Sequence, residues 1–206
     1  MRKKLFLLCF FFLKLAFADS FTETLSQSER AWLEAHPIIK HTGNPHYLPY
    51  EAFDANGKHL GMVAEYLDEI EKMLGIQIKR VPSTSWQNAL EMSRNKQVTI
   101  LTNYTMDDAF ASTHSITKGF IQSPVVVIKQ KSQKYQPFIS DFSKLKGQKI
   151  AFGKQYAFLR PIIKEHPELD YREVDTIENV LKGVSSGECD AAFVSLNIGT
   201  YTISEF

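Results

Sequence analysis

The alternation of hydrophobic and polar residues near the start of the chain predicts a strand, a loop, a helix and a second strand. Residues 38–42 form a short apolar run that suits a buried strand. Along residues 60–74, apolar side chains recur at the spacing that gives a helix one apolar face, and Gly75 follows as a C-terminal stop. Residues 76–81 then alternate as a strand does. This order is that of a βαβ unit, so we expect its two strands to lie parallel.

The same rhythm of strands and helices continues to the end of the chain. Further strands are expected at residues 98–101, 123–128, 148–152, 171–174 and 190–194. Helices are expected from Ser26 or Ser28 to His36, and at residues 86–94, 139–147, 157–166, 177–185 and 195–201. The prediction is therefore an α/β fold in which helices connect parallel strands.

The loops that follow strand ends carry the candidate ligand-binding residues. In open α/β sheets these loops face the ligand crevice, and aromatic rings and a few polar groups suit such a site. The residues that we expect to line the crevice are Tyr47, Tyr50, Phe53, Asn103, Tyr104, Thr105, Phe120, Gly153, Tyr156 and Ser195. We expect Tyr50 to be exposed there, and ordinary core packing is the alternative for every aromatic residue in the set. The helix start after Gly153 is expected to offer free backbone N–H groups to an anion.

Composition limits the classes of partner. The chain has 206 residues, of which 44% are hydrophobic and 23% charged, and this composition is typical of a globular protein. Its formal net charge is +1 and it has no basic block, so we do not expect it to bind nucleic acid.

The N-terminus predicts export. A positively charged start is followed by a short apolar run and by the small residues Ala16 and Ala18, as in a signal peptide cleaved after Ala18. The alternative is a membrane anchor, but the run is shorter than the roughly 20 residues that span a bilayer. Removing residues 1–18 deletes four basic residues and changes the net charge from +1 to −3. We therefore expect a periplasmic protein.

Metal, cofactor and catalytic signatures are not evident in the sequence. Of the two cysteines, Cys9 leaves with the signal peptide, and Cys189 is expected to be an inert core thiol. His41 and His46 flank a loop without a nearby thiol or carboxylate pattern, so no zinc site or other metal site is predicted. The sequence lacks Gly-x-Ser-x-Gly, a P-loop and His-Glu-x-x-His, and the prediction is a protein that is not an enzyme and has no cofactor.

A resemblance is carried by a series of short motifs. They are Pro49-Tyr50-Glu51-Ala52-Phe53, Asn56-Gly57, Leu60-Gly61, Leu74-Gly75-Ile76 and Trp86. In this order they resemble the N-terminal lobe of bacterial extracellular solute-binding proteins of family 3. Residues 28–37 resemble the opening segment of the variant found in sensor kinases.

The resemblance implies a two-lobed periplasmic-binding-protein-like type II fold, with lobe 1 at residues 19–124 and lobe 2 at residues 125–206. It also implies capture of a small molecule between the lobes, with a membrane transporter or a sensor kinase as partner.

Two departures from the family pattern limit what the resemblance implies. Amino-acid-binding members carry an arginine after the third strand, where this chain has Asp108, and a lobe-two aspartate where it has Ser195. An α-amino-acid ligand is therefore disfavoured. The chain also stops at Phe206, before the family's return segment to lobe 1, so a C-terminally truncated member is expected. The alternatives are a dehydratase-like enzyme of related fold and a non-binding remnant of a larger sensor protein.

Overall fold

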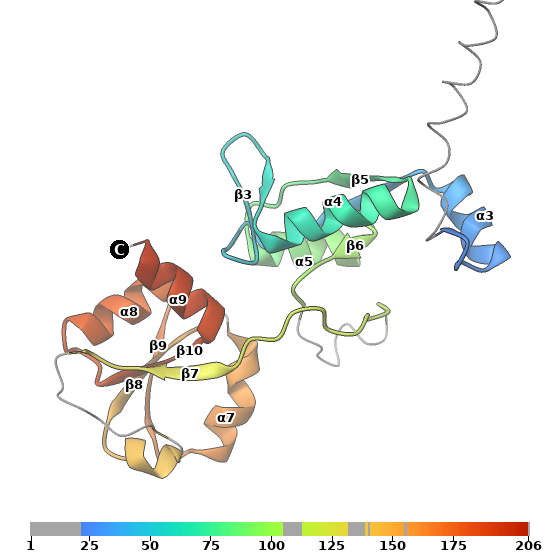
Figure 1. The fold of residues 1–206 in the computed structure, drawn as a ribbon. Helices are drawn as coiled ribbons and strands as arrows, with labels where there is room; N and C mark the ends of the chain where they lie inside the picture. Colours follow the sequence, from blue (N-terminus) through green and yellow to red (C-terminus); the bar gives the residue numbers. More distant parts are fainter. Residues whose placement is uncertain (1–21, 105–112, 132–138, 140, 155, 206) are drawn as a thin grey trace, which may run out of the picture. The chain divides into compact units, whose positions relative to one another are not determined.

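The computed structural model describes residues 22–104, 113–131, 139, 141–154 and 156–205, so the predicted signal peptide and Thr105–Asp108 lie outside the described residues. The chain divides into two compact units (Figure 1). Unit 1 comprises Met1–Tyr104, and unit 2 comprises Thr105–Phe206. No helix among the described residues combines the length and the apolar character that crossing a membrane requires.

Unit 1 contains the predicted βαβ unit. Its main sheet has the order β5-β1-β6, with β1 at Ile38–Thr42, β5 at Gln77–Arg80 and β6 at Ile100–Leu101. Both neighbours run parallel to β1. The connecting helices are α4 (Met62–Leu74) and α5 (Trp86–Arg94), which pack on β5 and on β1 and β6, respectively. The predicted parallel pair is thus confirmed.

Glycines fix both ends of α4. At the N-cap, Gly61 has φ +93°, and a Cβ there would lie 2.6 Å from the Tyr50 carbonyl oxygen. At the C-cap, Gly75 adopts the left-handed conformation and donates its N–H to the Glu71 carbonyl, which is the predicted stop. The apolar face buries Val63 and Leu67. The backbone of residue 50 therefore lies directly against the start of this helix.

The segment between β1 and α4 is not the plain loop that the sequence predicted. It contains a second, antiparallel sheet of the order β2-β3-β4, with β2 at His46–Tyr47, β3 at Glu51–Phe53 and β4 at His59–Leu60. Strands of two or three residues are too short to show a recognisable alternation, so the hydrophobic pattern could not reveal them.

The first described helix is held by its cap rather than by packing. In α3 (Gln27–Ala35), the Ser26 hydroxyl accepts a hydrogen bond from the Glu29 N–H, and the Glu29 carboxylate accepts one from the Ser26 N–H. This reciprocal capping box confirms the predicted helix start. None of the helix residues is buried, and Trp32 stacks on the His36 ring.

Unit 2 is built around a four-stranded sheet of the order β7-β10-β8-β9. The strands are β7 (Val125–Ile128), β8 (Lys149–Gly153), β9 (Asp170–Val174) and β10 (Ala191–Ser195). The strand β7 runs antiparallel to β10, and the other pairs are parallel. The helices are η1 (Phe142–Leu145), η2 (Ala157–Leu159), α7 (Arg160–Glu165), α8 (Ile177–Ser185) and α9 (Leu196–Ser204).

One buried apolar cluster of unit 2 lies between this sheet and α8. It includes Val180 and Val184 of α8 and Ala192 and Val194 of β10. Helices α8 and α9 contact each other and both pack on β10 (Figure 1). Cys189 belongs to the same cluster, as predicted, and its burial raises the pKa of the thiol. The fold thus combines two α/β units, each with buried apolar residues of its own.

Candidate functional site

The carboxyl end of the main sheet in unit 1 holds an unusual asparagine. Thr42 of β1 pairs with Leu101 of β6, so the residues that follow both strands emerge at one edge of the sheet. Asn103 has a left-handed backbone with φ +55°, and its buried Nδ2 atom has no hydrogen-bond partner among the residues that the structure describes. A left-handed backbone is uncommon outside glycine, although asparagine adopts it more readily than most residues, and buried polar atoms are normally bonded. These two features make Asn103 the strongest ligand-binding candidate of the predicted set.

Tyr104, the next residue, lies beside the first residue of α5. Its ring centroid is 6.2 Å from that of Trp86, and both residues are half-buried. Among the other residues predicted after β6, Phe120 is 42% exposed, and Thr105 lies outside the described residues.

Tyr50 is buried, contrary to the expected exposure in a crevice. Its residue surface is only 6% exposed, and its ring lies 5.2 Å from that of Tyr47. The backbone explains this placement, because the Tyr50 N–H donates to the Tyr47 carbonyl and the Tyr50 carbonyl accepts from the Val63 N–H at the start of α4. Tyr47 is half-buried, and burial raises the pKa of its hydroxyl. Core packing, the alternative weighed for these aromatics, describes Tyr50.

In unit 2, the parallel strands β8 and β10 bring Gly153 and Ser195 to the same edge of the sheet. The Ser195 and Ser123 hydroxyl oxygens lie 2.7 Å apart, and the Asn197 N–H donates to the Ser123 oxygen. Ser195 is buried, and it is a hydroxyl partner of Ser123 rather than an acidic group.

The predicted anion site after Gly153 is not supported. The Lys154 N–H donates to the Val174 carbonyl at 2.9 Å, and the Tyr156 N–H donates to the Gly153 carbonyl at 3.0 Å. These N–H groups are therefore not free for a ligand. Tyr156 is itself buried, and its ring covers Gly153 so closely that a Cβ there would lie 2.9 Å from the ring.

A cavity of about 650 Å³ lies elsewhere in unit 2 and contains none of the predicted residues. Its lining comes from the end of β7 and the residues that follow it, from α8 and from α9. The lining residues are Ile128, Lys129, Gln130, Lys131, Glu178, Leu181, Lys182, Val184, Ser185 and Ile203. The Lys129 ammonium donates to Gln148, and the Gln130 amide donates to the Ser185 carbonyl. Since these polar groups already have protein partners, we do not assign a ligand to this cavity.

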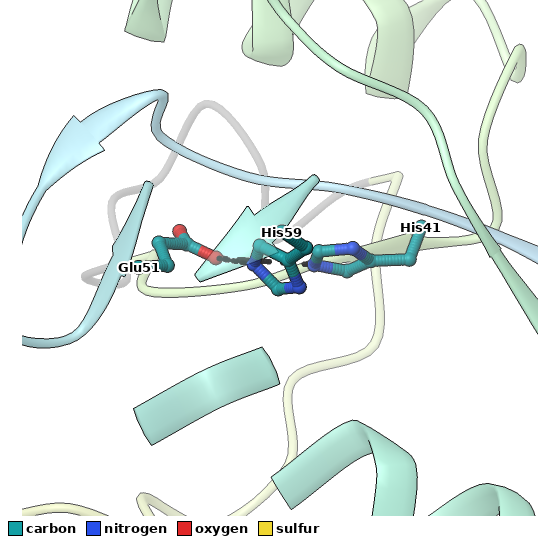
Figure 2. Close-up of side chains that lie close together, drawn as sticks. All are labelled: His41, Glu51 and His59. Carbon is teal, nitrogen blue, oxygen red and sulfur yellow. Dashed lines mark hydrogen bonds and ion pairs between the residues drawn. The ribbon is translucent and has the colours of Figure 1, made fainter. Parts of the chain in front are cut away.

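A cluster of polar side chains is buried in unit 1, where three strands converge. His41 of β1, Glu51 of β3 and His59 of β4 point toward one another (Figure 2). One carboxylate oxygen, Glu51 Oε2, lies 3.4 Å from His59 Nε2 and 3.9 Å from His41 Nε2. The side chains of His41 and Glu51 are fully buried, and that of His59 is 3% exposed. Their ligand-type atoms all lie within 4.8 Å of one another.

The Thr102 hydroxyl links two members of this cluster. It donates to Glu51 Oε2 at 2.5 Å, and its oxygen lies 2.9 Å from His41 Nε2. A hydroxyl has one proton to donate, so His41 must be the donor in the second contact. His41 therefore carries its proton on Nε2. The Nδ1 atoms of His41 and His59 are buried and have no hydrogen-bond partner in the described part of the chain.

Burial and hydrogen bonding control the charges in the cluster. Burial lowers the pKa of His41 to about 3, although Glu51 acts in the opposite direction. Burial also opposes ionisation of Glu51, but hydrogen bonds from His59, Thr102 and the Asn44 N–H outweigh it and lower the pKa of the carboxyl. The cluster therefore holds an ionised carboxylate beside a neutral imidazole at neutral pH.

This cluster was not predicted from the sequence. His41 was considered together with His46, which is exposed, and neither has a nearby thiol or carboxylate pattern in the sequence. Glu51 and His59 reach His41 only because β3 and β4 fold back over the end of β1, and those strands were not predicted. A two-histidine and carboxylate set of this kind offers ligand atoms that suit a metal ion, and the expectation of no metal site did not take it into account.

Comparison with known proteins finds a matching family and two related sensor proteins. The family model for bacterial extracellular solute-binding proteins, family 3, matches residues 39–169, which is more than half of the chain. The sensor protein EvgS of Escherichia coli O157:H7 is 24% identical over 182 residues, as is EvgS of E. coli K12. These matches cover 88% of this chain and 15% of either relative, so the chain corresponds to a small part of those sensor proteins.

Solved structures show the same fold. The periplasmic VFT2 domain of Bordetella pertussis BvgS has a TM-score of 0.75 at 16% identity, over 89% of this chain and 77% of that one. An ancestral amino-acid-binding protein, a precursor of cyclohexadienyl dehydratase, has a TM-score of 0.67 at 17% identity, over 85% and 78%. Holo ArgBP of T. maritima has a TM-score of 0.62 at 14% identity, over 85% and 76%. The predicted two-lobed, periplasmic-binding-protein-like fold is thereby confirmed.

Proposed function

Because this chain belongs to family 3 of the bacterial extracellular solute-binding proteins, we propose that it is an exported domain that binds a small molecule. The family match carries this proposal, and the fold shared with solved periplasmic binding domains supports it. The signal-like N-terminus is consistent with a periplasmic location.

The role that we propose is sensing. Both curated relatives are sensor proteins, and the BvgS neighbour is described as a periplasmic domain. A domain of this kind would report ligand binding to a sensor kinase. Transport through a membrane transporter is the other use of this family, and the relatives give it less support.

Asn103 is the residue that we place at the ligand. Its unpartnered Nδ2 group is a hydrogen-bond donor, so the ligand should present an acceptor such as a carbonyl or carboxylate oxygen. The left-handed backbone at φ +55° belongs to a class of conformations that cluster at binding sites, and asparagine adopts it more readily than most residues. Tyr104 and Trp86, which lie beside each other, would supply the apolar contact.

The other candidates rank below Asn103. Tyr47 and Phe53 are half-buried and remain candidates, whereas Tyr50, Gly153, Tyr156 and Ser195 would act by shaping the strand ends, since all four are buried. Ser195 provides a hydroxyl where amino-acid-binding members have an aspartate. We therefore propose a ligand other than an α-amino acid, such as a small aromatic or aliphatic carboxylate.

The proposal is tested by thermal shift with a panel of the twenty amino acids and of small aromatic and aliphatic carboxylates. Saturable stabilisation by a carboxylate that is not an α-amino acid is expected, because a ligand that binds only the folded state raises its stability. The panel should be repeated on Asn103→Gly, which tolerates the left-handed backbone but removes the amide. We expect this variant to lose the shift.

Asn56→Ala serves as the matched control, because Asn56 is exposed in the turn before β4. It should respond to the ligand as the unmodified chain does. A panel without any saturable shift would contradict the binding role, and equal shifts in Asn103→Gly would remove Asn103 from the site.

A further inference from the structure

The Glu51 carboxylate lacks a strong cationic partner in the described part of unit 1. The Asn44 N–H donates to Oε1 at 2.8 Å and the Thr102 hydroxyl donates to Oε2, but both donors are neutral. The contact with His59 is 3.4 Å long, beyond the usual range of a good hydrogen bond. Arg80 is already paired with Asp68 and Glu71. Buried charges in proteins are normally paired with an opposite charge or bound to a metal ion, so this carboxylate requires an explanation.

The nitrogens that face the carboxylate are the Nε2 atoms of the two rings. His59 Nε2 and His41 Nε2 both approach the same oxygen, Glu51 Oε2. The Nδ1 atoms of both rings are buried and have no hydrogen-bond partner among the described residues. Buried polar atoms are normally bonded, so the hydrogen bonds of the described residues do not by themselves account for the two rings.

The spacing of the cluster approaches that of a metal site. Zinc–ligand bonds of about 2.0–2.1 Å in a tetrahedron separate neighbouring ligand atoms by about 3.3 Å. The distance from His59 Nε2 to Glu51 Oε2, 3.4 Å, already meets this requirement. The distance from His41 Nε2 to the same oxygen is 3.9 Å, so an ion would have to draw these two atoms together by about 0.6 Å.

The donor set indicates which class of ion fits. Two imidazoles and one carboxylate suit zinc and other first-row divalent transition metals, whereas magnesium and calcium prefer oxygen ligands alone. Imidazole binds a metal ion through a ring nitrogen that carries no proton. The negative charge of Glu51 would offset part of the charge of the ion. The cluster thus supplies both the ligand atoms and the charge that such an ion requires.

We infer that His41, Glu51 and His59 form a binding site for a divalent transition metal ion of the zinc type. Three protein ligands leave a fourth position for a water molecule. Binding through His41 Nε2 requires this atom to give up the proton that it donates to Thr102 in the metal-free form, so metal binding breaks that hydrogen bond. The site ties β1 to the small β2-β3-β4 sheet, because its ligands come from β1, β3 and β4. Metal binding is therefore coupled to the folding of this part of unit 1.

Gly43 shows how closely the backbone fits around the carboxylate. A Cβ at this position would lie 2.2 Å from Glu51 Oε2 and 2.4 Å from Oε1. The absence of a side chain at residue 43 thus makes room for both carboxylate oxygens. This close fit holds the carboxylate in its place beside the two rings before any ion binds.

The first experiment asks whether the unmodified chain binds an ion. The tag-free chain is treated with EDTA, dialysed and titrated with Zn²⁺ by calorimetry, and then with Co²⁺ by visible absorption. We expect one Zn²⁺ per chain, an increase in Tm, and the intense ligand-field bands of four-coordinate cobalt. A chain that shows no saturable zinc binding would overturn the inference, as would a cobalt spectrum without four-coordinate bands.

The second experiment locates the ion. Glu51→Gln and His59→Gln each remove one ligand and should weaken zinc binding by more than tenfold, since even changes to the groups around metal ligands cost about 10–100-fold. His46→Gln is the matched control, because His46 lies in the same small sheet but is exposed. It should leave the affinity unchanged. If both ligand variants keep the affinity of the unmodified chain, or if His46→Gln loses it, the ion binds elsewhere and the inference is wrong.

Because these side chains are buried, circular dichroism must show whether each variant folds. If a variant is unfolded, the cobalt spectrum of the unmodified chain decides between a metal site and a purely hydrogen-bonded cluster. Neither experiment involves Asn103 or the ligand panel, so the failure of one proposal would not be mistaken for failure of the other.

Discussion

At the scale of single residues, the position of Glu51 depends on the absence of a side chain at Gly43. We predict that Gly43→Ala destabilises unit 1 by about 1–3 kcal/mol, the usual cost of overpacking a core, because the new methyl group would overlap both carboxylate oxygens. Urea denaturation of both proteins measures this difference. Gly119→Ala is the control, since an added Cβ there would meet nothing within 4 Å. Equal midpoints for Gly43→Ala and the unmodified chain would contradict the prediction.

A second residue-scale prediction concerns the backbone after α5. Lys96 is exposed and has φ +55°, a conformation that is costly for residues with a Cβ and free of strain for glycine. Lys96→Gly should therefore stabilise the protein by about 0.5–1 kcal/mol. Lys146→Gly is the matched control, because Lys146 is also exposed but has φ −58° and should lose stability on the same change. Denaturation midpoints that move in the same direction for both variants would refute this account.

The sequence located some site residues and missed others for a physical reason. Asn103 and Tyr104 follow a strand of a parallel sheet, and the general geometry of such sheets is enough to place them at its carboxyl edge. By contrast, His41, Glu51 and His59 meet through the pairing of very short strands, which leaves no periodic signal in the sequence. Tyr50 also follows a strand end, but its backbone hydrogen bonds to α4 bury it, and no local pattern reveals such a tertiary contact.

At the scale of elements, capping residues and glycines indicated where helices begin and end. The starts at Ser26, Ser85 and Thr176 each have a side chain that accepts a hydrogen bond from the first turn. The helices that follow therefore begin close to the predicted residues. Burial was less predictable, since the apolar Trp32 of α3 is 45% exposed although a pattern of apolar residues suggests packing.

The capping box of α3 should make this helix sensitive to acid. Hydrogen bonds from the Ser26 side chain and backbone hold the pKa of Glu29 below its ordinary value of 4.5. A carboxyl with a lowered pKa in the folded state contributes stability above its unfolded pKa and loses it as the pH falls through the folded value. We therefore predict that amide exchange protection in α3 decreases as the pH falls below about 4.5.

The control for this experiment is Glu29→Gln, which keeps the reciprocal hydrogen bonds of the capping box but has no carboxyl to protonate. Protection of α3 in this variant should be independent of pH over the same range, apart from the intrinsic exchange rate. Because α3 buries none of its residues, the global denaturation midpoint should not change with the variant. Acid sensitivity that is equal in Glu29→Gln would show that another group is responsible.

At the scale of the whole molecule, the two units share one arrangement of strands but differ in how the polar groups at the strand ends are bonded. In each, parallel strands bring the residues that follow them to one edge of a sheet. In unit 1 this edge carries an asparagine whose Nδ2 atom has no partner among the described residues, whereas in unit 2 the corresponding N–H and hydroxyl groups are bonded within the protein. We therefore expect substitutions at Asn103 to affect ligand binding more than substitutions at Ser195.

The N-terminal segment of the chain allows a direct test of export. The positive start, apolar run and Ala16-x-Ala18 sequence predict that the periplasmic form begins at Asp19 and has a net charge of −3, since removing four basic residues changes the formal charge from +1. Intact mass and N-terminal sequencing of the periplasmic fraction measure this directly. Ala18→Arg places a long charged side chain at the cleavage site and should leave the chain unprocessed. Ala35→Arg, at the exposed end of α3, should be processed normally. A periplasmic chain that retains residues 1–18, or Ala18→Arg cleaved at the same bond, would refute the predicted signal peptide.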